Sequence, residues 1–344
     1  MKNKLLAVLT LVQCTLAFAQ SKNDSEPFMT KSFRESIAST KVETSGGNVT
    51  VTGIDGSESK VEVYITSNNG RSLDKNEIDE RLREMYDLDV SVSNNRLVAT
   101  AKSKSRIRDW KKALSIGFKL YVPKSVSNDL STSGGNISLS NLSGTQDFVT
   151  SGGNLSLDNL SGKLKGRTSG GNVSIKNSKN EIDLATSGGN IDAINNDGTM
   201  RLGTSGGSVY LKNLKGNIRA MTSGGNVDGS NIDGELFAET SGGNVKLDDL
   251  SCSVETSTSG GNISVAIKQL GKYVTIHGSG GHIDLELPKG KGADLNLEGD
   301  KVRTDHLENF SGKIKDDEVD GKLNGGGVPV KVRNSGGRIS LSLR

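Results

Sequence analysis

The chain has 344 residues, with 44 glycines but only 4 prolines, and its 43 basic residues nearly balance 40 acidic ones. Abundant glycine without proline and without a three-residue period excludes a collagen-like chain and a flexible linker. The net charge of +3 gives no general electrostatic reason to expect nucleic acid as a partner.

Residues 1–19 have the pattern of a secretory signal peptide. Lys2 and Lys4 supply the charged start, and residues 5–16 form a short apolar run. The small residues of Ala17-Phe18-Ala19 fit a cleavage site, so we expect the mature chain to begin at Gln20. The apolar run is too short to span a bilayer, and no other stretch is comparable, so the sequence predicts no transmembrane segment in the mature chain.

Cysteine usage also favours an exported bacterial protein. Cleavage would remove Cys14 and leave Cys252 as a lone thiol, which cannot form an intramolecular disulfide. Lipidation of Cys14 is a weaker alternative, because Gln13 precedes it where lipoprotein signals have a small residue. We therefore expect export to the periplasm, the cell surface or the medium.

Residues 20–131 have mixed patterns and predict a cap for the repeats that follow. One repeat-like unit spans 42–54, and strands are expected at 61–65 and 118–122. Residues 74–85 resemble a helix with a capping box from Asp74 to Glu77, and 88–101 resemble a hairpin around Asn94-Asn95. A stack of strands must protect its open end against edge pairing, and this segment is suited to that role.

The segment 132–289 repeats Thr-Ser-Gly-Gly-Asn, with Ser-Gly-Gly returning every 18 residues. Apolar residues recur at positions 6, 8, 11 and 15 of each repeat, counted from Thr132 as position 1. This alternation predicts two short strands per repeat, each with one buried face, and therefore a parallel β-helix, or β-solenoid, with 18-residue rungs. The repeated glycine pairs are Gly134 and Gly135, Gly152 and Gly153, Gly170 and Gly171, Gly188 and Gly189, Gly206 and Gly207, Gly224 and Gly225, Gly242 and Gly243, and Gly260 and Gly261.

Two turns must separate the strands of each rung. The glycine pair predicts one turn, since glycine admits positive φ and a close backbone approach. Position 13 predicts the other, with Asn180 tolerated there and Cys252 poorly suited to it. The asparagine after each pair predicts a structural ladder of side-chain amides along the axis, interrupted or ended by Ser208 and His282. Its members are Asn136, Asn154, Asn172, Asn190, Asn226, Asn244 and Asn262.

The tail, 290–344, keeps strand alternation but loses the period. Gly325-Gly326-Gly327 and Ser335-Gly336-Gly337 resemble degenerate rungs. We expect the charges of the last strands to discourage edge pairing. These charges are Lys331, Arg333, Arg338 and Arg344.

No residue pattern predicts a catalytic, metal or cofactor site. Calcium-binding nonapeptide repeats need Gly-Gly-x-Gly-x-Asp, and here the later glycine and aspartate are replaced by apolar residues. His277 and His282 could bind a metal, but a simpler interpretation is that His282 replaces a ladder asparagine. A polysaccharide-cleaving enzyme would need long loops and paired carboxylates, for which the strict spacing leaves no room.

Three further features have structural explanations as well as functional ones. A basic run beside Trp110 could touch anionic headgroups, or it could be a solvated face. Its members are Lys102, Lys104, Arg106, Arg108, Lys111 and Lys112. Tyr210 and Phe237 are expected to point outward, but two scattered rings do not form a platform for sugars. The threonine column beginning at Thr132 is expected to point inward.

The run Val122-Pro123-Lys124, followed by Leu130-Ser131-Thr132-Ser133-Gly134-Gly135-Asn136-Ile137 and many Ser-Gly-Gly rungs, resembles a bacterial β-strand-repeat family. Its members are of unknown function and are commonly described as adhesins. The resemblance covers most of the mature chain and implies a parallel β-solenoid on an envelope or secreted protein. It supplies no catalytic residues, and some relatives accompany envelope-stress operons.

These observations favour a non-enzymatic, adhesin-like or structural binding protein of the bacterial cell envelope. Its expected partner is an envelope protein or a surface glycan. One alternative is a periplasmic accessory protein in envelope-stress sensing, and another, much weaker, is a carbohydrate-active β-helix enzyme.

Overall fold

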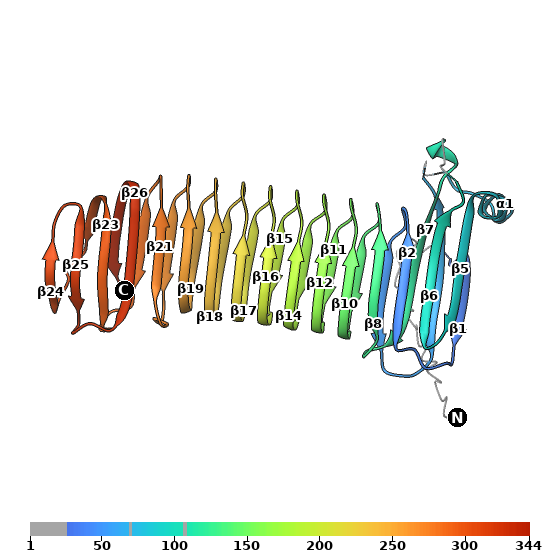
Figure 1. Ribbon diagram of the computed structural model, residues 1–344, viewed down its shortest axis with the longest axis horizontal. Coiled ribbons are helices and arrows are strands. Elements are labelled where there is room, and N and C mark those ends of the chain that lie inside the picture. Colours follow the sequence, from blue (N-terminus) through green and yellow to red (C-terminus); the bar gives the residue numbers. More distant parts are fainter. Residues whose placement is uncertain (1–25, 69–70, 106–108) are drawn as a thin grey trace, which may run out of the picture.

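The computed structural model describes residues 26–68, 71–105 and 109–344. The signal-peptide prediction, with Cys14 and Gln20, and residues Arg106 and Arg108 of the basic run lie outside these residues. The fold is almost entirely β, as the sequence predicts, and its strands stack into a long rod with α1 (Lys75–Met85) at one end (Figure 1).

The central part of the rod is a stack of coils whose strands pair in parallel. Leu155 pairs with Ile137 on one side and Val173 on the other, so that equivalent repeat positions meet. The earlier coils each contribute two short strands. These are β8 (Ser127–Thr132) with β9 (Ile137–Ser140), β10 (Ser143–Val149) with β11 (Leu155–Asp158), β12 (Ser161–Arg167) with β13 (Val173–Lys176), and β14 (Lys179–Ala185) with β15 (Ile191–Ile194).

Later coils follow the same path. In three of them one longer strand bends from one side of the rod to the other, namely β17 (Val209–Met221), β18 (Val227–Thr240) and β19 (Val245–Thr258). The short strands of the later coils are β16 (Asp197–Gly203), β20 (Ile263–Ile267), β21 (Val274–Gly278) and β22 (Ile283–Leu287). The rod therefore has two long sides. We call the side containing β9, β11, β13, β15, the first halves of β17–β19, β20 and β22 the first face. The side containing β8, β10, β12, β14, β16, the second halves of β17–β19 and β21 is the second face.

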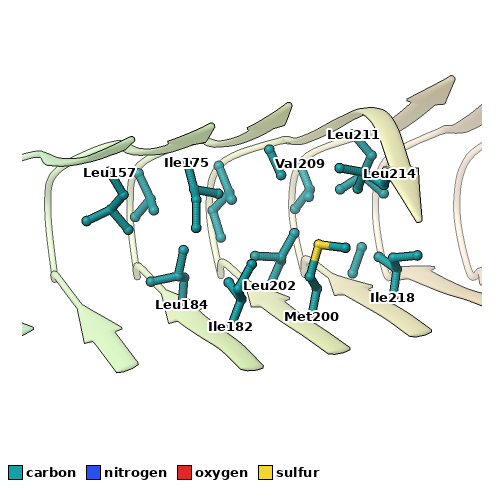
Figure 2. Packing of buried hydrophobic residues seen from close by; sticks show 14 of the residues in the cluster. Leu157, Ile175, Ile182, Leu184, Met200, Leu202, Val209, Leu211, Leu214 and Ile218 are labelled. Carbon is teal, nitrogen blue, oxygen red and sulfur yellow. The ribbon is translucent and has the colours of Figure 1, made fainter. Parts of the chain in front are cut away.

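The core lies between the two faces. Leu157, Ile175 and Val209 point inward from the first face, towards Leu184, Leu202 and Ile218 of the second (Figure 2). Each such buried side chain contributes about 1.5–3 kcal/mol relative to an exposed one. Side chains at equivalent positions of neighbouring coils are also matched in size. The Phe148 ring fills the space beside Gly166 of the next coil, and a Cβ added to Gly166 would lie 2.2 Å from that ring.

The repeat-like unit near the N-terminus is a full member of this stack, although it is remote in sequence. β2 (Ser39–Thr44) lies between β6 (Arg96–Ser103) and β8, and β3 (Val49–Ile54) lies between β7 (Leu114–Pro123) and β9. Asn48 therefore contacts Asn136, 88 positions away, in the way that ladder neighbours contact each other 18 positions apart. The chain leaves the stack after β3 and returns to it with β6 and β7 on one side of this unit, before β8 and β9 pair with its other side.

The N-terminal end of the rod is finished by antiparallel strands. β4 (Ser59–Ser67) pairs with β7 and with β1 (Met29–Phe33), while β5 (Tyr86–Ser93) pairs with β6. The predicted hairpin is confirmed, with Asn94 and Asn95 both at positive φ. A short 3-10 helix, η1 (Trp110–Lys112), precedes β7.

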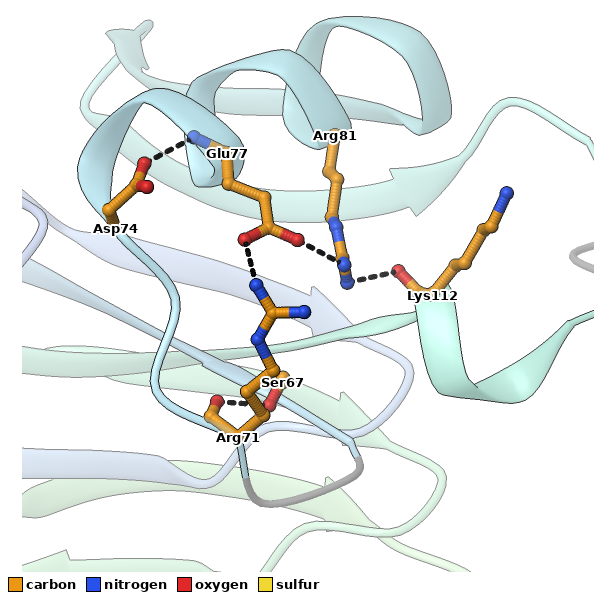
Figure 3. A network of polar contacts seen from close by, with 6 residues as sticks. All are labelled: Ser67, Arg71, Asp74, Glu77, Arg81 and Lys112. Atoms are coloured by element: carbon orange, nitrogen blue, oxygen red, sulfur yellow. Dashed lines mark hydrogen bonds and ion pairs between the residues drawn. The ribbon is translucent and has the colours of Figure 1, made fainter.

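The predicted helix at this end is also confirmed. The Asp74 side chain accepts a hydrogen bond from the Glu77 amide, which is the N-terminal cap expected from the sequence. Glu77 pairs in turn with Arg71 and Arg81, and Arg81 also donates to the Lys112 carbonyl (Figure 3). These contacts fix α1 against the loop that leads into β7.

A second returning segment lies near the C-terminal end. The last strand, β26 (Val328–Leu343), does not lie at the edge but pairs with β21 and β22 on one side and β23 (Ala293–Thr304) on the other. The prediction that its charges protect an edge is therefore wrong. β25 (Glu318–Leu323) and β24 (Phe310–Ile314) extend the sheet beyond β23.

The two glycine runs of the tail differ in role. Gly337 stacks on Gly281, and the Asn334 side chain donates to the Gly281 carbonyl, so the Ser335-Gly336-Gly337 run takes part in the turn column as expected. Gly325-Gly326-Gly327 instead forms a turn at positive φ before β26 and is not a degenerate rung.

The Thr-Ser-Gly-Gly-Asn turn holds neighbouring coils together through its threonine and asparagine side chains. The buried Thr186 hydroxyl donates to the Gly171 carbonyl of the preceding coil at 2.8 Å and accepts from the Gly189 amide of its own coil. The Asn190 amide donates to the side-chain oxygen of Asn172 in the preceding coil. The same pattern recurs in neighbouring turns, and the threonine column points inward as expected.

The two glycines of each turn are not equivalent, and in the regular turns neither adopts the positive φ that was expected for the pair. A Cβ on Gly189 would lie 2.1 Å from the Gly171 carbonyl oxygen, whereas a Cβ on Gly188 would meet nothing nearer than 3.6 Å. Glycine is required at the second position because the backbones of successive coils approach closely there.

The second turn begins earlier than predicted. Left-handed residues occupy position 10, three residues before the position-13 glycines. They are Asn141, Asn159, Asn177, Asn195, Asn213, Asn231 and Asp249. Gly144, Gly162, Gly198, Gly216, Gly234 and Asn180 do have positive φ, as expected for position 13. Cys252 stands in this column but lies within β19 without a left-handed conformation, and its side chain is 1% exposed.

We expect Gly189→Ala to destabilise the protein by about 1–3 kcal/mol or more, because the new methyl group overlaps the Gly171 carbonyl. Gly188→Ala is the matched control in the same turn and should change stability by less than about 0.5 kcal/mol. Chemical denaturation of both variants measures the difference. Equal stabilities would show that the close approach of the coils at this glycine is not a constraint.

Thr204→Val should cost about 1–3 kcal/mol, since it keeps the shape of the side chain but leaves the Gly189 carbonyl and the Gly207 amide without their hydroxyl partner. Thr204→Ser retains the hydroxyl and should lose less. Urea midpoints of the two variants test this ordering. A valine variant as stable as wild type would mean that the hydroxyl does not hold the coils together.

Burial raises the pKa of the Cys252 thiol to about 12, with a smaller contribution from Asp233. The folded-state pKa therefore lies above the unfolded value of about 8.5. Stability linked to this group is complete below the unfolded pKa and is lost as the pH rises towards the folded one. We expect Cys252→Ala to lose less stability than wild type between about pH 8.5 and 12, measured by urea unfolding at each pH. Parallel pH profiles for the two proteins would contradict this.

Candidate binding face

Outward side chains of the first face form straight rows along the rod. Because the coils pair in register, equivalent outward positions follow one another at about 4.8 Å. At its N-terminal end the first face continues through β3, β7 and β4. One such row, which we call the axial row, crosses ten consecutive strands from β7 to β20. Its members, in spatial order, are Lys119, Thr50, Ser138, Ser156, Ser174, Asp192, Tyr210, Asp228, Lys246 and Ser264.

Tyr210 is the centre of the most distinctive part of this row. Its side chain is 41% exposed and stands between Asp192 of β15 and Asp228 of β18. Lys212 and Lys246 lie at the same shallow hollow, whose volume is about 440 Å³. Within the described residues, the side chains of Tyr210, Asp192 and Asp228 make no hydrogen bond, ion pair or ring contact.

The charges around Tyr210 are mixed. Lys246 pairs with Asp248 at 3.8 Å. Partial burial raises the pKa of Asp228 above its ordinary value, the Lys246 ammonium opposes that shift and the Asp248 carboxylate adds to it. The surroundings therefore offer both hydrogen-bond acceptors and donors around one exposed ring.

A second aromatic cluster lies on the first face near its N-terminal end. The Lys119 ammonium is 4.6 Å from the centre of the Tyr64 ring, and the Lys60 ammonium is 4.3 Å from that of Tyr121. Glu62 pairs with Lys60 at 2.7 Å and accepts from the Tyr64 hydroxyl. The hydrogen bond to Glu62 raises the pKa of Lys60. Burial alone would raise the pKa of Glu62, but its bonds to Lys60 and Tyr64 outweigh burial and lower it.

Aromatic side chains of the second face are also engaged. The Arg219 guanidinium lies 3.8 Å from the centre of the Phe237 ring, and the Tyr273 hydroxyl donates to Glu235 at 2.6 Å. That hydrogen bond, with burial, raises the pKa of Tyr273 to about 12. Tyr210 thus differs from these rings, which already have partners within the fold.

The asparagine ladder and turn glycines predicted from sequence lie together at one corner of the rod, where they stabilise the backbone. The ladder is not a chain of side-chain amides, because each side-chain oxygen accepts from the backbone amide of the next coil. Ser208 continues the column through its hydroxyl, and the His282 ring accepts from the Arg338 amide. His282 thus replaces a ladder asparagine, in agreement with the simpler of the two interpretations of this histidine.

An amide-to-amide ladder does exist, but at the left-handed position 10 and not at the predicted position after the glycine pair. Asn159 donates to Asn141, Asn213 to Asn195 and Asn231 to Asn213 at 2.7–3.0 Å. The recurrence of asparagine at that position was the available signal, since asparagine tolerates a left-handed conformation.

Among the residues that the structure describes, the remaining predicted features do not assemble into a site. Trp110 is 60% exposed, while Lys102 pairs with Glu43 and Lys104 with Asp87. In the portion of the chain that the structure describes, no three His, Cys, Asp or Glu side chains gather as metal ligands. No helix in that portion is both long and apolar enough to cross a membrane.

Comparisons with solved structures give matches of low similarity. A candidate adhesin from Bacteroides fragilis NCTC 9343 is 13% identical, with 91% of this chain and 96% of that chain covered and a TM-score of 0.24. A candidate lipid binding protein from Parabacteroides distasonis ATCC 8503 is 14% identical, with coverages of 93% and 98% and a TM-score of 0.28. A candidate cell adhesion protein from Clostridium sporogenes ATCC 15579 is 10% identical, with coverages of 93% and 100% and a TM-score of 0.17.

No curated protein matches the sequence. Among protein families, the model of Toastrack DUF4097 matches residues 176–342. The matched segment begins at the last residue of β13 and ends within β26. The later coils and the returning C-terminal strand are therefore the part of the chain that is similar to the Toastrack family.

Proposed function

We propose that the chain is a non-enzymatic, adhesin-like binding protein of the bacterial cell envelope, built as a parallel β-solenoid with 18-residue rungs. The observation that carries this proposal is the continuous register of the first face, which holds outward side chains in straight rows over many coils. Such a rigid surface suits an extended partner.

The turns between strands support binding rather than catalysis. Only four residues separate β8 from β9, and two separate β9 from β10, so these turns do not build the walls of a deep cleft. Catalysis on a polysaccharide would require carboxylates facing each other across such a cleft. The near balance of acidic and basic residues over the whole chain also favours a partner with mixed or little charge, such as a surface glycan or an envelope protein.

The test is sedimentation of the purified mature protein with cell envelopes of the source bacterium. We expect saturable binding without release of reducing sugar ends, because the rows bind a partner and no group cleaves it. Gly188→Ala should bind like wild type, whereas Gly189→Val should lose binding as its coil is distorted. Absence of binding by the wild-type protein, or release of reducing ends, would overturn the proposal.

A further inference from the structure

We propose that Tyr210, Asp192 and Asp228 form a subsite for an uncharged sugar ring, within a carbohydrate chain that lies along the axial row. The inference rests on the proposed binding function and names its ligand class. It assigns the sugar to the first face and to one place along the rod.

The register positions the three side chains for a flat ligand. Asp192 and Asp228 flank Tyr210 in the axial row, each about 4.8 Å from it along the rod, which places the carboxylates on opposite sides of the phenol. The hollow of about 440 Å³ at this place lies within the range of small-molecule sites.

The chemistry of these groups fits a sugar. A pyranose has an apolar face that can cover an aromatic ring and a rim of hydroxyl groups that both donate and accept hydrogen bonds. The unpaired carboxylates of Asp192 and Asp228 can accept from hydroxyl groups on either side of the ring. The ammonium groups of Lys212 and Lys246, at the same hollow, can donate to hydroxyl oxygens.

The same lysines argue against a cationic ligand. An exposed tyrosine between two carboxylates could bind an ammonium group through its ring face. Here Lys212 occupies the outward position of β17 that follows Tyr210. Lys246 of β19 lies next to Asp228 of β18 in the strand register. The rings near Lys60, Lys119 and Arg219 already contact cations of the protein, whereas Tyr210 does not.

The row beyond Tyr210 favours a chain over a single sugar. Ser174, Ser156 and Ser138 succeed Asp192 towards the N-terminal end, each in register with the next. These short side chains carry hydroxyl groups and extend less far from the sheet than the Tyr210 side chain does. A carbohydrate chain stacked on Tyr210 can therefore continue over them without a steric barrier.

The experiment uses polysaccharide released from envelopes of the source bacterium by protease treatment, and measures its affinity for the intact protein. Tyr210→Ala should weaken binding about tenfold, because the stacking surface is lost, and Tyr210→Phe should retain most of it. Asp192→Ala and Asp228→Ala should each weaken binding severalfold. Phe237→Ala is the matched control on the second face and should bind like wild type.

Each other outcome has a defined meaning. If wild type binds envelopes and Tyr210→Ala binds them equally, the subsite is wrong while the proposed function stands. If wild type binds envelopes but not their protease-treated polysaccharide, the partner is a protein and the sugar assignment is overturned. Competition by tetramethylammonium at constant ionic strength would identify a cation site instead, which also overturns it. Failure of wild type to bind envelopes removes the proposed function itself.

Discussion

The close approach of successive coils at the second turn glycine is the constraint on which the rest of the structure depends. With no Cβ at Gly189, the Gly171 carbonyl comes within reach of the Thr186 hydroxyl, which joins two coils and satisfies a buried donor and acceptor. The repetition of this contact keeps the coils in register. Register in turn aligns the inward side chains into one core and the outward side chains into rows. A backbone contact at a corner of the rod therefore sets the geometry of the first face.

Polar ladders and apolar core support each other in this arrangement. Buried amides and carbonyls at the corner would each cost about 1–3 kcal/mol without partners. The threonine hydroxyls and asparagine side chains supply those partners between coils, as Thr204 and Asn190 show. A single coil has neither neighbour, so its stability belongs to the stack. The contacts that stabilise the core therefore also fix the positions of the residues in the axial row.

Features encoded by local pattern could be predicted, and features that depend on distant partners could not. The cap of α1 at Asp74 and the hairpin at Asn94-Asn95 involve neighbouring residues and are confirmed. The insertion of β26 beside β22 depends on pairing between segments far apart, which no local periodicity records. For the same reason, the placement of Tyr64 and Tyr121 on the face that carries Tyr210 follows only from the register of β4, β7 and β3.

Both ends of the rod are closed by antiparallel strands, β4 and β5 at one end and β25 and β24 at the other. Next to each closure a segment that is remote in sequence lies within the stack, β2–β3 at one end and β26 at the other. The coils between them contact only their neighbours, through contacts that are nearly the same in each. A duplication or deletion of one 18-residue unit there would preserve both closures and every type of contact. Evolution can thus change the length of the rod in steps of about 4.8 Å, and shift Tyr210 relative to its ends, without changing the structure of either end.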